Sequence, residues 1–272
     1  MAGSGFGTNF RITTWGETHG AGVGVVVDGC PAGLPLERED VQKYLDRRKP
    51  GQSKYTTQRK EGDQVEILSG IFEGRTTGTP ISMVVYNKDQ RSKDYSNIKD
   101  IYRPGHADFT FDMKYGFRDY RGGGRSSGRE TIGRVAAGAV AAKVLKELGI
   151  EIKAYAKAIA GIEVSKEHFD FAEMNNNPFN MPDKEAAKLV QEKADQMIKE
   201  MDSIGGIIEC QITGMPVGIG ETVFDKLDAE LSKAIMSIGS VKGFEIGDGF
   251  EAANLRGSEN NDDFICVDGK VE

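Results

Sequence analysis

Hydrophobic residues recur with helical spacing in four stretches of this 272-residue chain. Between 130 and 148 the apolar positions are mixed with many alanines and with Gly133 and Gly138, which favours a central, closely packed helix. Between 184 and 201 one side is charged and the other is apolar and includes Leu189, a pattern typical of a surface helix. The predicted helices span residues 38–47, 130–148, 184–201 and 225–236.

Short apolar runs predict strands, and they recur in a weak internal repeat. Residues 26–34 are echoed by residues 211–219. Each copy continues into a predicted helix and then into a returning strand, over 65–72 in the first copy and over 244–250 in the second. The first copy goes on to an apolar strand over 81–86, for which the second has no counterpart. Strands and segregated helices without simple βαβ alternation indicate an α+β layered domain.

The composition is that of a globular protein without a membrane or secretion segment. Hydrophobic residues make up 38% of the chain, and no run approaches the roughly 18 apolar residues that a membrane helix needs. The N-terminus also lacks the charged and apolar regions of a secretion signal. We therefore expect a cytoplasmic protein without membrane association. The scattered cysteines favour free thiols over a disulfide framework or a metal site, and they are Cys30, Cys210 and Cys266.

Charge is distributed unevenly along the chain, whose formal net charge is −7. Residues 47–60 hold six bases and no acid, and residues 103–134 hold seven bases against four acids. Two basic, glycine-containing segments in an acidic protein indicate focused binding of small anions. The alternatives are that these runs are solvated charge, or that residues 118–129 bind single-stranded nucleic acid. Sparse aromatic residues and the negative net charge argue against nucleic acid.

Residues 121–131 combine three consecutive glycines with arginines and serines, and they lead directly into the alanine-rich helix. Glycines let backbone N–H groups approach an anion, serines add hydroxyl donors, and a helix N-terminus carries partial positive charge. The segment is therefore typical of a phosphate cradle, although it matches neither a Walker loop nor the Rossmann fingerprint. The alternative is a flexible glycine turn in which Ser126 or Ser127 only caps the helix.

Two of the three histidines lie beside glycines, in positions that are unusual for core packing. His19 lies in the sequence GETHG and His106 in the sequence RPGHAD. Because histidine gains and loses a proton near neutral pH, both are candidates for general acid or base catalysis. His168 lies on an ordinary polar stretch, and we expect no role for it.

Together these motifs resemble the chorismate synthase family, and the resemblance covers nearly the whole chain. Residues 16–20 are similar to the first family signature, with Thr18 where serine is usual, and residues 124–141 are similar to the second. Further matches follow in family order at residues 48–59, 103–108, 114–116 and 245–250. The expected fold is a single α+β domain over 1–272, a β-α-β sandwich in which helices pack between antiparallel sheets.

The resemblance implies a lyase that converts 5-enolpyruvylshikimate 3-phosphate to chorismate and phosphate by anti-1,4-elimination. This is the last common step of aromatic biosynthesis, the shikimate pathway. It also implies reduced FMN as the cofactor, NADPH as a possible external reductant, and a homotetramer. A flavoprotein that holds this substrate needs several arginines, because their fork suits phosphate and carboxylate alike. The alternative is a phosphate lyase or transferase that uses no flavin.

Site residues follow from the same resemblance. His106 is expected to help protonate the reduced flavin, and His19 to assist departure of the substrate phosphate. Thr18 and Ser127 are expected to support proton relay. The residues expected to bind FMN are Arg125, Ser126, Ser127, Gly239 and Ser240. The residues expected to bind the substrate or a dinucleotide phosphate are Arg48, Lys54, Arg59 and Arg129, with lysine at 54 in place of the more common arginine. No metal ligand is expected.

Three segments of the family have no match within these residues. They are a glycine-rich flavin-binding stretch, a Lys-Pro-Thr segment and an Arg-His-Asp signature. The expectation is therefore that residues 1–272 alone are a C-terminally incomplete version of the fold, bind FMN poorly and turn over little or no substrate.

Overall fold

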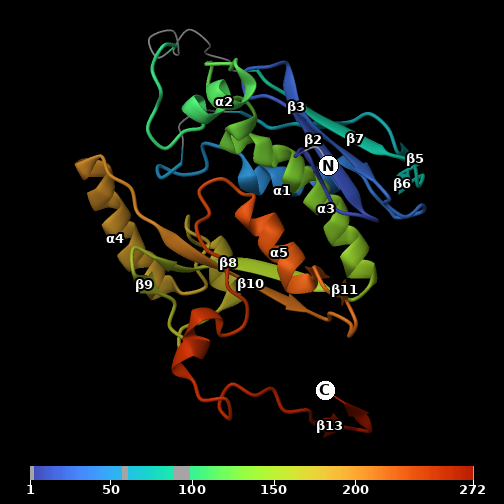
Figure 1. The fold of residues 1–272 in the computed structure, drawn as a ribbon, viewed down its shortest axis with the longest axis vertical. Coiled ribbons are helices and arrows are strands. Elements are labelled where there is room, and N and C mark those ends of the chain that lie inside the picture. Colours follow the sequence, from blue (N-terminus) through green and yellow to red (C-terminus); the bar gives the residue numbers. More distant parts are fainter. Residues whose placement is uncertain (1–2, 57–60, 89–98, 272) are drawn as a thin grey trace. The chain divides into compact units, whose positions relative to one another are not determined.

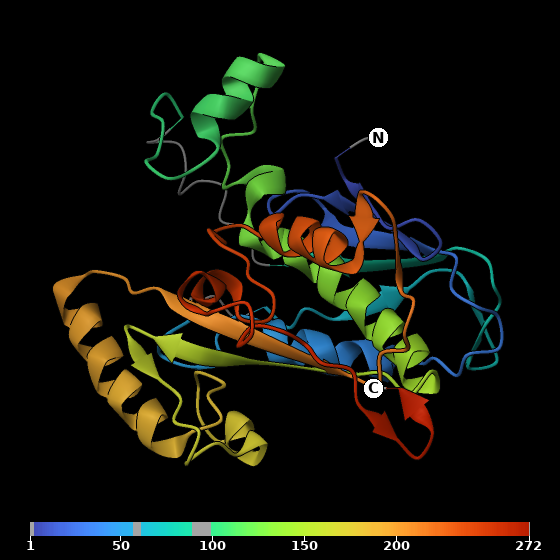
Figure 2. The same ribbon diagram turned by 60° about the horizontal axis from the view of Figure 1, so that its bottom comes forward.

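The computed structural model describes residues 3–56, 61–88 and 99–271. The chain divides into two compact units, Met1–Pro216 and Val217–Glu272. Figures 1 and 2 show the ribbon from two directions. Among the described residues, no helix combines the length and the apolar character needed to cross a membrane.

A five-stranded antiparallel sheet forms the centre of the first unit. Its central strand β3 is buried over most of its length. The strand predicted over 81–86 is confirmed as β7. The strand predicted over 65–72 is divided, because Gly70 turns the chain with a φ of 82°. Across the sheet the strands are β1 (Gly5–Phe6), β2 (Arg11–Gly16), β3 (Gly22–Asp28), β7 (Ile81–Tyr86) and β4 (Val65–Ile67), and a separate hairpin holds β5 (Ile71–Phe72) and β6 (Arg75–Thr76).

Helices α1 (Arg38–Arg48) and α3 (Thr131–Glu147) lie against one face of this sheet (Figure 1). Gly133 lets α3 approach closely, because a Cβ there would lie 3.0 Å from the Thr14 side chain and 3.1 Å from the Gly24 carbonyl oxygen. The prediction of a closely packed central helix is therefore confirmed. The core between sheet and helices includes Val23, Val25, Val27, Val41, Leu45, Ile81, Met83, Ala136, Ala139 and Val140.

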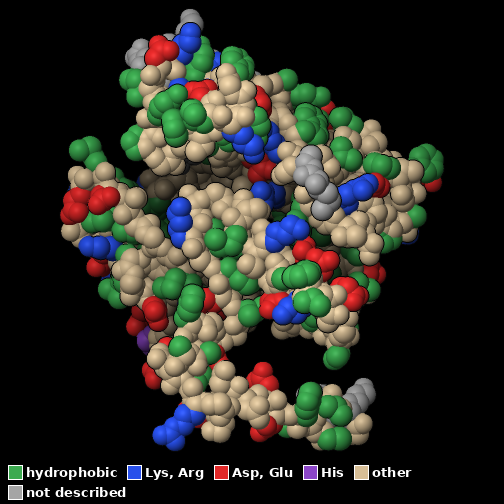
Figure 3. Space-filling view, viewed as in Figure 1, with side chains coloured by type: hydrophobic (Ala, Val, Ile, Leu, Met, Phe, Trp, Pro, Cys, Tyr) green, Lys and Arg blue, Asp and Glu red, His purple; other side chains and the backbone are tan. Residues whose placement is uncertain are grey.

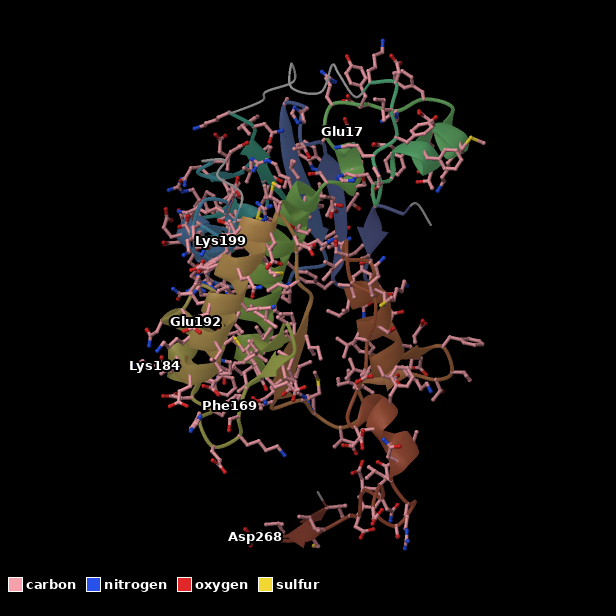
Figure 4. The ribbon with its side chains drawn as sticks, turned by 90° about the vertical axis from the view of Figure 1, so that its left-hand side faces the viewer. Glu17, Phe169, Lys184, Glu192, Lys199 and Asp268 are labelled. Carbon is pink, nitrogen blue, oxygen red and sulfur yellow. The ribbon has the colours of Figure 1, made fainter. Side chains whose placement is uncertain are left out.

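The rest of the first unit holds a three-stranded antiparallel sheet in the order β10-β8-β9 and the amphipathic helix α4. Helix α4 buries Val190 and Ala194 and exposes charged residues, which Figure 4 marks at Lys184, Glu192 and Lys199. The surface helix predicted here is confirmed, but Leu189 is exposed rather than on its buried side. The bounds are β8 (Glu151–Ile159), β9 (Ile162–Glu163), η4 (Phe171–Asn175), α4 (Lys184–Glu200) and β10 (Gly206–Thr213).

Asp183 starts α4 as its N-cap. Its carboxylate accepts hydrogen bonds from the backbone N–H groups of Glu185, Ala186 and Ser165. Burial raises the pKa of Asp183, but these three donors outweigh it and hold the pKa below its usual value. The sequence NMPDKEA thus ends a loop and begins a helix at one buried, fully bonded carboxylate.

The second unit contains two short hairpins and helix α5. The helix predicted over 225–236 is present from Leu227. The prediction of a returning strand over 244–250 is wrong. Residues 241–246 have no regular structure, and Gly247 and Gly249 both adopt positive φ. Its elements are β11 (Gly220–Glu221), β12 (Asp225–Lys226), α5 (Leu227–Met236), η5 (Gly249–Asn254), β13 (Cys266–Val267) and β14 (Lys270–Val271).

Candidate functional site

His19 lies in the turn that joins β2 to β3, and Figure 4 marks this turn at Glu17. The turn is closed by hydrogen bonds from the Glu17 N–H to the Gly22 carbonyl oxygen at 3.3 Å and from the Gly20 N–H to the Glu17 carbonyl oxygen at 3.1 Å. Only 4% of His19 is exposed. The neighbouring Thr18 hydroxyl oxygen is buried and has no hydrogen-bond partner among the described residues. A buried imidazole and a buried hydroxyl thus sit side by side in one short turn.

The His19 ring packs against Gly122 of the glycine segment. A Cβ at Gly122 would lie 2.7 Å from His19 Cδ2 and 2.9 Å from Nε2, and Gly122 has a φ of 79°. Only glycine fits both restrictions. The pKa of nearby Asp119 is lowered mainly by its hydrogen bonds to Arg121, with a smaller contribution from the His19 charge. The structure therefore brings His19 and the predicted phosphate cradle together.

The glycine segment reaches α3 through two short 3-10 helices, η2 (Gly124–Ser126) and η3 (Gly128–Glu130). Ser127 caps η3 by accepting a hydrogen bond at 3.3 Å from the Arg129 N–H. The Ser126 hydroxyl donates to the Gly123 carbonyl oxygen at 2.6 Å and is exposed. No described atom lies within 4 Å of a Cβ added at Gly124 or at Gly128, so both leave the backbone accessible. The segment therefore combines a helix cap, made by Ser127 on η3, with open space beside the backbone at Gly124 and Gly128.

The Arg125 guanidinium points back toward strand β2. It donates to the Thr14 hydroxyl at 2.7 Å, to the Thr14 carbonyl oxygen at 3.2 Å and to the Gly16 carbonyl oxygen at 3.1 Å. The Thr14 hydroxyl in turn donates to Glu130 at 2.7 Å. Arg125 therefore ties the end of β2, just before the His19 turn, to the start of α3.

Arg48 and Arg129 share one buried carboxylate. Asp63 accepts from Arg129 at 2.7 Å and from Arg48 at 2.8 Å, and its side chain is 0% exposed. Arg129 also donates to Glu61 at 2.8 Å. Burial lowers the pKa of Arg48, whereas the charge of Asp63 opposes that change. The two arginines predicted to bind phosphate are thus already held by carboxylates, with Arg129 almost fully buried and Arg48 partly open to solvent.

His106 lies just before helix α2 (Asp108–Tyr115) and is exposed. Its Nδ1 atom is 3.0 Å from the Pro104 carbonyl oxygen. The base of this segment is fixed by Arg103, which makes two hydrogen bonds to Asp108 at 2.8 and 2.9 Å and a third to the Gly122 carbonyl oxygen at 2.8 Å. The Arg103 guanidinium holds the pKa of Asp108 at about 2. His106 is therefore connected to the His19 region through Arg103 and Gly122.

Helix α2 leaves much of its apolar surface in solvent. Phe109, Met113 and Tyr115 are each more than half exposed, and Figure 3 shows hydrophobic side chains gathered over α2 on the visible face. Tyr102 packs edge-on against Phe109 with ring centroids 5.4 Å apart. The segment thus has a fixed base and an uncovered apolar side.

Four further residues were predicted for the site, and none of them is joined to His19 by a contact described above. Lys54 is exposed and pairs with Asp195 of α4 at 2.7 Å. Gly239 and Ser240 follow α5 in the second unit, where Ser240 has a φ of 71°. Arg59 lies outside the described residues. Within the described part of the chain, no group of three His, Cys, Asp or Glu side chains could hold a metal ion.

A family model for chorismate synthase matches residues 10–271, which include the His19 turn, the glycine segment and the arginine cluster formed by Arg48, Arg129, Asp63 and Glu61. The chain belongs to the chorismate synthase family. The resemblance inferred from the sequence is therefore confirmed, and with it the class of enzyme, a chorismate-forming lyase of aromatic biosynthesis.

Similar chorismate synthases come from distant organisms. That of Lachnospira eligens is 69% identical over 271 residues, covering 100% of this chain and 74% of the relative. That of Methanococcoides burtonii is 59% identical, covering 100% of this chain and 75% of the relative. A structure titled "Crystal Structure of Chorismate Synthase" matches with a TM-score of 0.80 and 32% identity, over 97% of this chain and 77% of that one.

Sequence reasoning missed the acidic and amide partners of this chorismate synthase site. The basic run over 47–60 was counted without Glu61 and Asp63, which follow it directly and neutralise Arg129 and Arg48. Asn87 was also missed, although a polar residue directly after a buried strand is a recognisable signal. A charge count that had continued three residues further would have found both acids.

Proposed function

We propose that the residues of this chain serve the conversion of 5-enolpyruvylshikimate 3-phosphate to chorismate and phosphate by anti-1,4-elimination, in a site built around the buried Thr18–His19 turn. The observation that carries the proposal is the packing of His19 against the glycine segment. The family supplies the reaction, and this packing sets a proton-handling group against the glycine segment, which has open space at Gly124 and Gly128 further along the chain. The elimination removes a phosphate and a proton from the substrate without net redox change.

The residues of the first unit fit a phosphorylated flavin in two respects. The Thr18 hydroxyl is buried without a hydrogen-bond partner among the described residues, so it is available to a bound molecule. Gly124 and Gly128 leave open space where a side chain would stand, which suits approach of an anion to the backbone. Reduced FMN, when bound, supplies electron density that helps the allylic phosphate depart. The residues of the first unit that would hold it are Arg125, Ser126 and Ser127, and Gly239 and Ser240 of the second unit are candidates from the family resemblance alone.

Proton handling falls to the two histidines in this proposal. His19 donates a proton to the departing phosphate, and burial shields that transfer from bulk water. Thr18 and Ser127 support relay beside it. His106 helps keep the reduced flavin protonated, and its contact with Pro104 occupies only one of the two ring nitrogens of an exposed side chain.

The arginines divide into two roles. Arg129 has its Nε and both terminal nitrogens bonded to Asn87, Asp63 and Glu61, so it orders the site rather than reaching out of it. Arg48 is more exposed and keeps donors for a substrate phosphate or carboxylate, with Arg59 and Lys54 as further candidates. Because each guanidinium has five N–H groups, Arg48 can bind Asp63 and an anion at once.

The remaining features are carried by the family alone. We propose a single domain with the β-α-β sandwich and its internal repeat, assembly as a homotetramer, a cytoplasmic location, and NADPH as an external reductant for the flavin. We also propose that nucleic acid is not a partner and that no metal takes part in the reaction.

The test compares His19→Asn, His106→Asn and the control His168→Asn, an exposed histidine with no proposed role. Chorismate and phosphate formation are measured anaerobically with substrate and reduced FMN, and substrate binding is measured separately by calorimetry. We expect His19→Asn to lower kcat by roughly 100-fold to 10,000-fold, as for loss of a general acid, with His168→Asn unchanged. Phosphate release that needs no flavin would instead favour a simple phosphate lyase. Failure to bind the substrate at all would overturn the proposal.

A further inference from the structure

Asn87 holds both ends of the two-residue segment Thr18–His19. It follows strand β7, and its backbone N–H donates to the Ala21 carbonyl oxygen at 3.0 Å. Its side-chain nitrogen donates to the carbonyl oxygens of Glu17 at 2.9 Å and Gly20 at 2.8 Å. These two carbonyls come directly before Thr18 and directly after His19. The amide therefore bridges the turn across its base.

The other end of the same amide accepts from Arg129. Asn87 Oδ1 lies 2.8 Å from Arg129 Nε, and Arg129 is bound in turn to Asp63 and Glu61. The orientation of the amide is fixed by its partners, because a flipped amide would set oxygen against two carbonyls and N–H against N–H. Both amide hydrogens and the oxygen are used, so the side chain makes a continuous link from the His19 turn to the arginine cluster.

We propose that Asn87 is a positioning residue for His19, a proposal that rests on the role of His19 given above. It sets where the imidazole stands relative to the arginine cluster, and it does so without touching substrate. Only an asparagine of this length satisfies two carbonyl acceptors on one side and a guanidinium donor on the other. Because shifts of about 1 Å can cost 100-fold in rate, loss of this bridge should appear in kcat rather than in substrate affinity.

The substitution Asn87→Asp tests the acceptor side and the donor side of the bridge separately. Asn87→Asp keeps the shape and the acceptor for Arg129, and it adds a charge that favours Arg129. It also removes both donors and sets a carboxylate against the carbonyl oxygens of Glu17 and Gly20. Asn87→Ser is the second variant, because it shortens the side chain and breaks both halves of the bridge without adding a charge. Asn176→Asp, at an exposed position directly after η4, is the matched control for the charge change.

The first measurement is a double-mutant cycle in kcat between Asn87→Asp and His19→Asn. We expect Asn87→Asp alone to lower kcat roughly 10-fold to 100-fold with little change in KM, and Asn176→Asp to have no effect. In the His19→Asn background, Asn87→Asp should lower kcat little further, because the imidazole that Asn87 positions is absent. Additive losses in that background would overturn the proposal. A role limited to stability would give such additivity.

The second measurement is independent of turnover. The chain has 3 histidines, so carbon-edited NMR of the rings can resolve each of them. Asn87→Asp and Asn87→Ser should move the ring resonances of His19 and leave those of His106 and His168 in place. An unmoved His19 ring would overturn the proposal. If His19→Asn leaves turnover intact, the catalytic role proposed for His19 fails, and a moved ring still establishes that Asn87 positions it.

Discussion

The turn that carries His19 and the segment that carries His106 are held in different ways. The His19 frame, by which we mean residues 17–21 with Asn87, Arg129, Asp63 and Arg48, is a chain of hydrogen bonds that is mostly buried. The His106 segment, residues 103–115, is bonded at its base through Asp108 and is exposed at the histidine and along α2.

The two histidines differ in whether their positions are fixed before a ligand binds. Buried polar groups that are hydrogen-bonded are costly to disturb, so the bonds of Asn87, Arg129 and Asp63 fix the His19 turn before any ligand binds. An exposed histidine with one backbone contact can follow what binds beside it. Substitutions in the His19 frame should therefore lower the free energy of unfolding. Substitutions in the His106 segment should lower it only at Arg103 and Asp108, which form its base.

The largest effect is expected for Asp63→Asn. This change leaves the buried Arg129 and the partly buried Arg48 without the charge that they share, and breaking such a pair costs about 3 to 5 kcal/mol. The control is Asp28→Asn, which breaks the exposed pair with Arg11 and should cost less than about 1 kcal/mol. Urea unfolding measures both free energies, and equal losses would show that the frame is no more rigid than the surface.

A smaller loss is expected for Gly122→Ala. Both this position and Gly124 have positive φ, so alanine is strained at either by about 1 to 2 kcal/mol. At Gly122 the new methyl group also meets the His19 ring, and overpacking of that kind adds about 1 to 3 kcal/mol. Gly124→Ala is the matched control, because no described atom lies within 4 Å of its added Cβ.

Unfolding of the two alanine variants, together with the NMR position of the His19 ring, checks the contact. A shifted ring in Gly122→Ala alone is the expected result. If both variants lose the same stability and neither moves the ring, the contact between Gly122 and His19 is not what holds the imidazole.

Elements that depend on the local sequence pattern could be predicted, whereas contacts between residues far apart in the chain could not. Helices α1, α3 and α4 and strand β7 follow from local periodicity, so their predicted bounds agree with the structure to within one or two residues. The prediction of a strand over 244–250 was wrong, because Gly247 and Gly249 adopt positive φ and interrupt the extended backbone that the local apolar pattern indicated. Asn87 and Asp63 were not foreseen, because their roles depend on partners such as Arg129 that lie 42 and 66 positions away in the chain.

The smallest effect concerns the base of the His106 segment. Arg103 lowers the pKa of Asp108 from 3.8 to about 2 in the folded protein, so Asp108 stabilises the fold above pH 4 and loses that contribution as the pH falls toward 2. Asp108→Asn should therefore cost on the order of 2 kcal/mol at pH 7, and wild type and variant should converge between pH 4 and pH 2.

Asp28→Asn is again the control for that change, because it breaks the exposed pair with Arg11, which does not pair with Asp108. It should cost less than about 1 kcal/mol. Unfolding in urea at a series of pH values gives both differences. A gap between wild type and Asp108→Asn that persists unchanged to pH 2 would mean that the ionised carboxylate is not what fixes the base of the segment. The exposed His106 would then depend on the aromatic contact between Tyr102 and Phe109 instead.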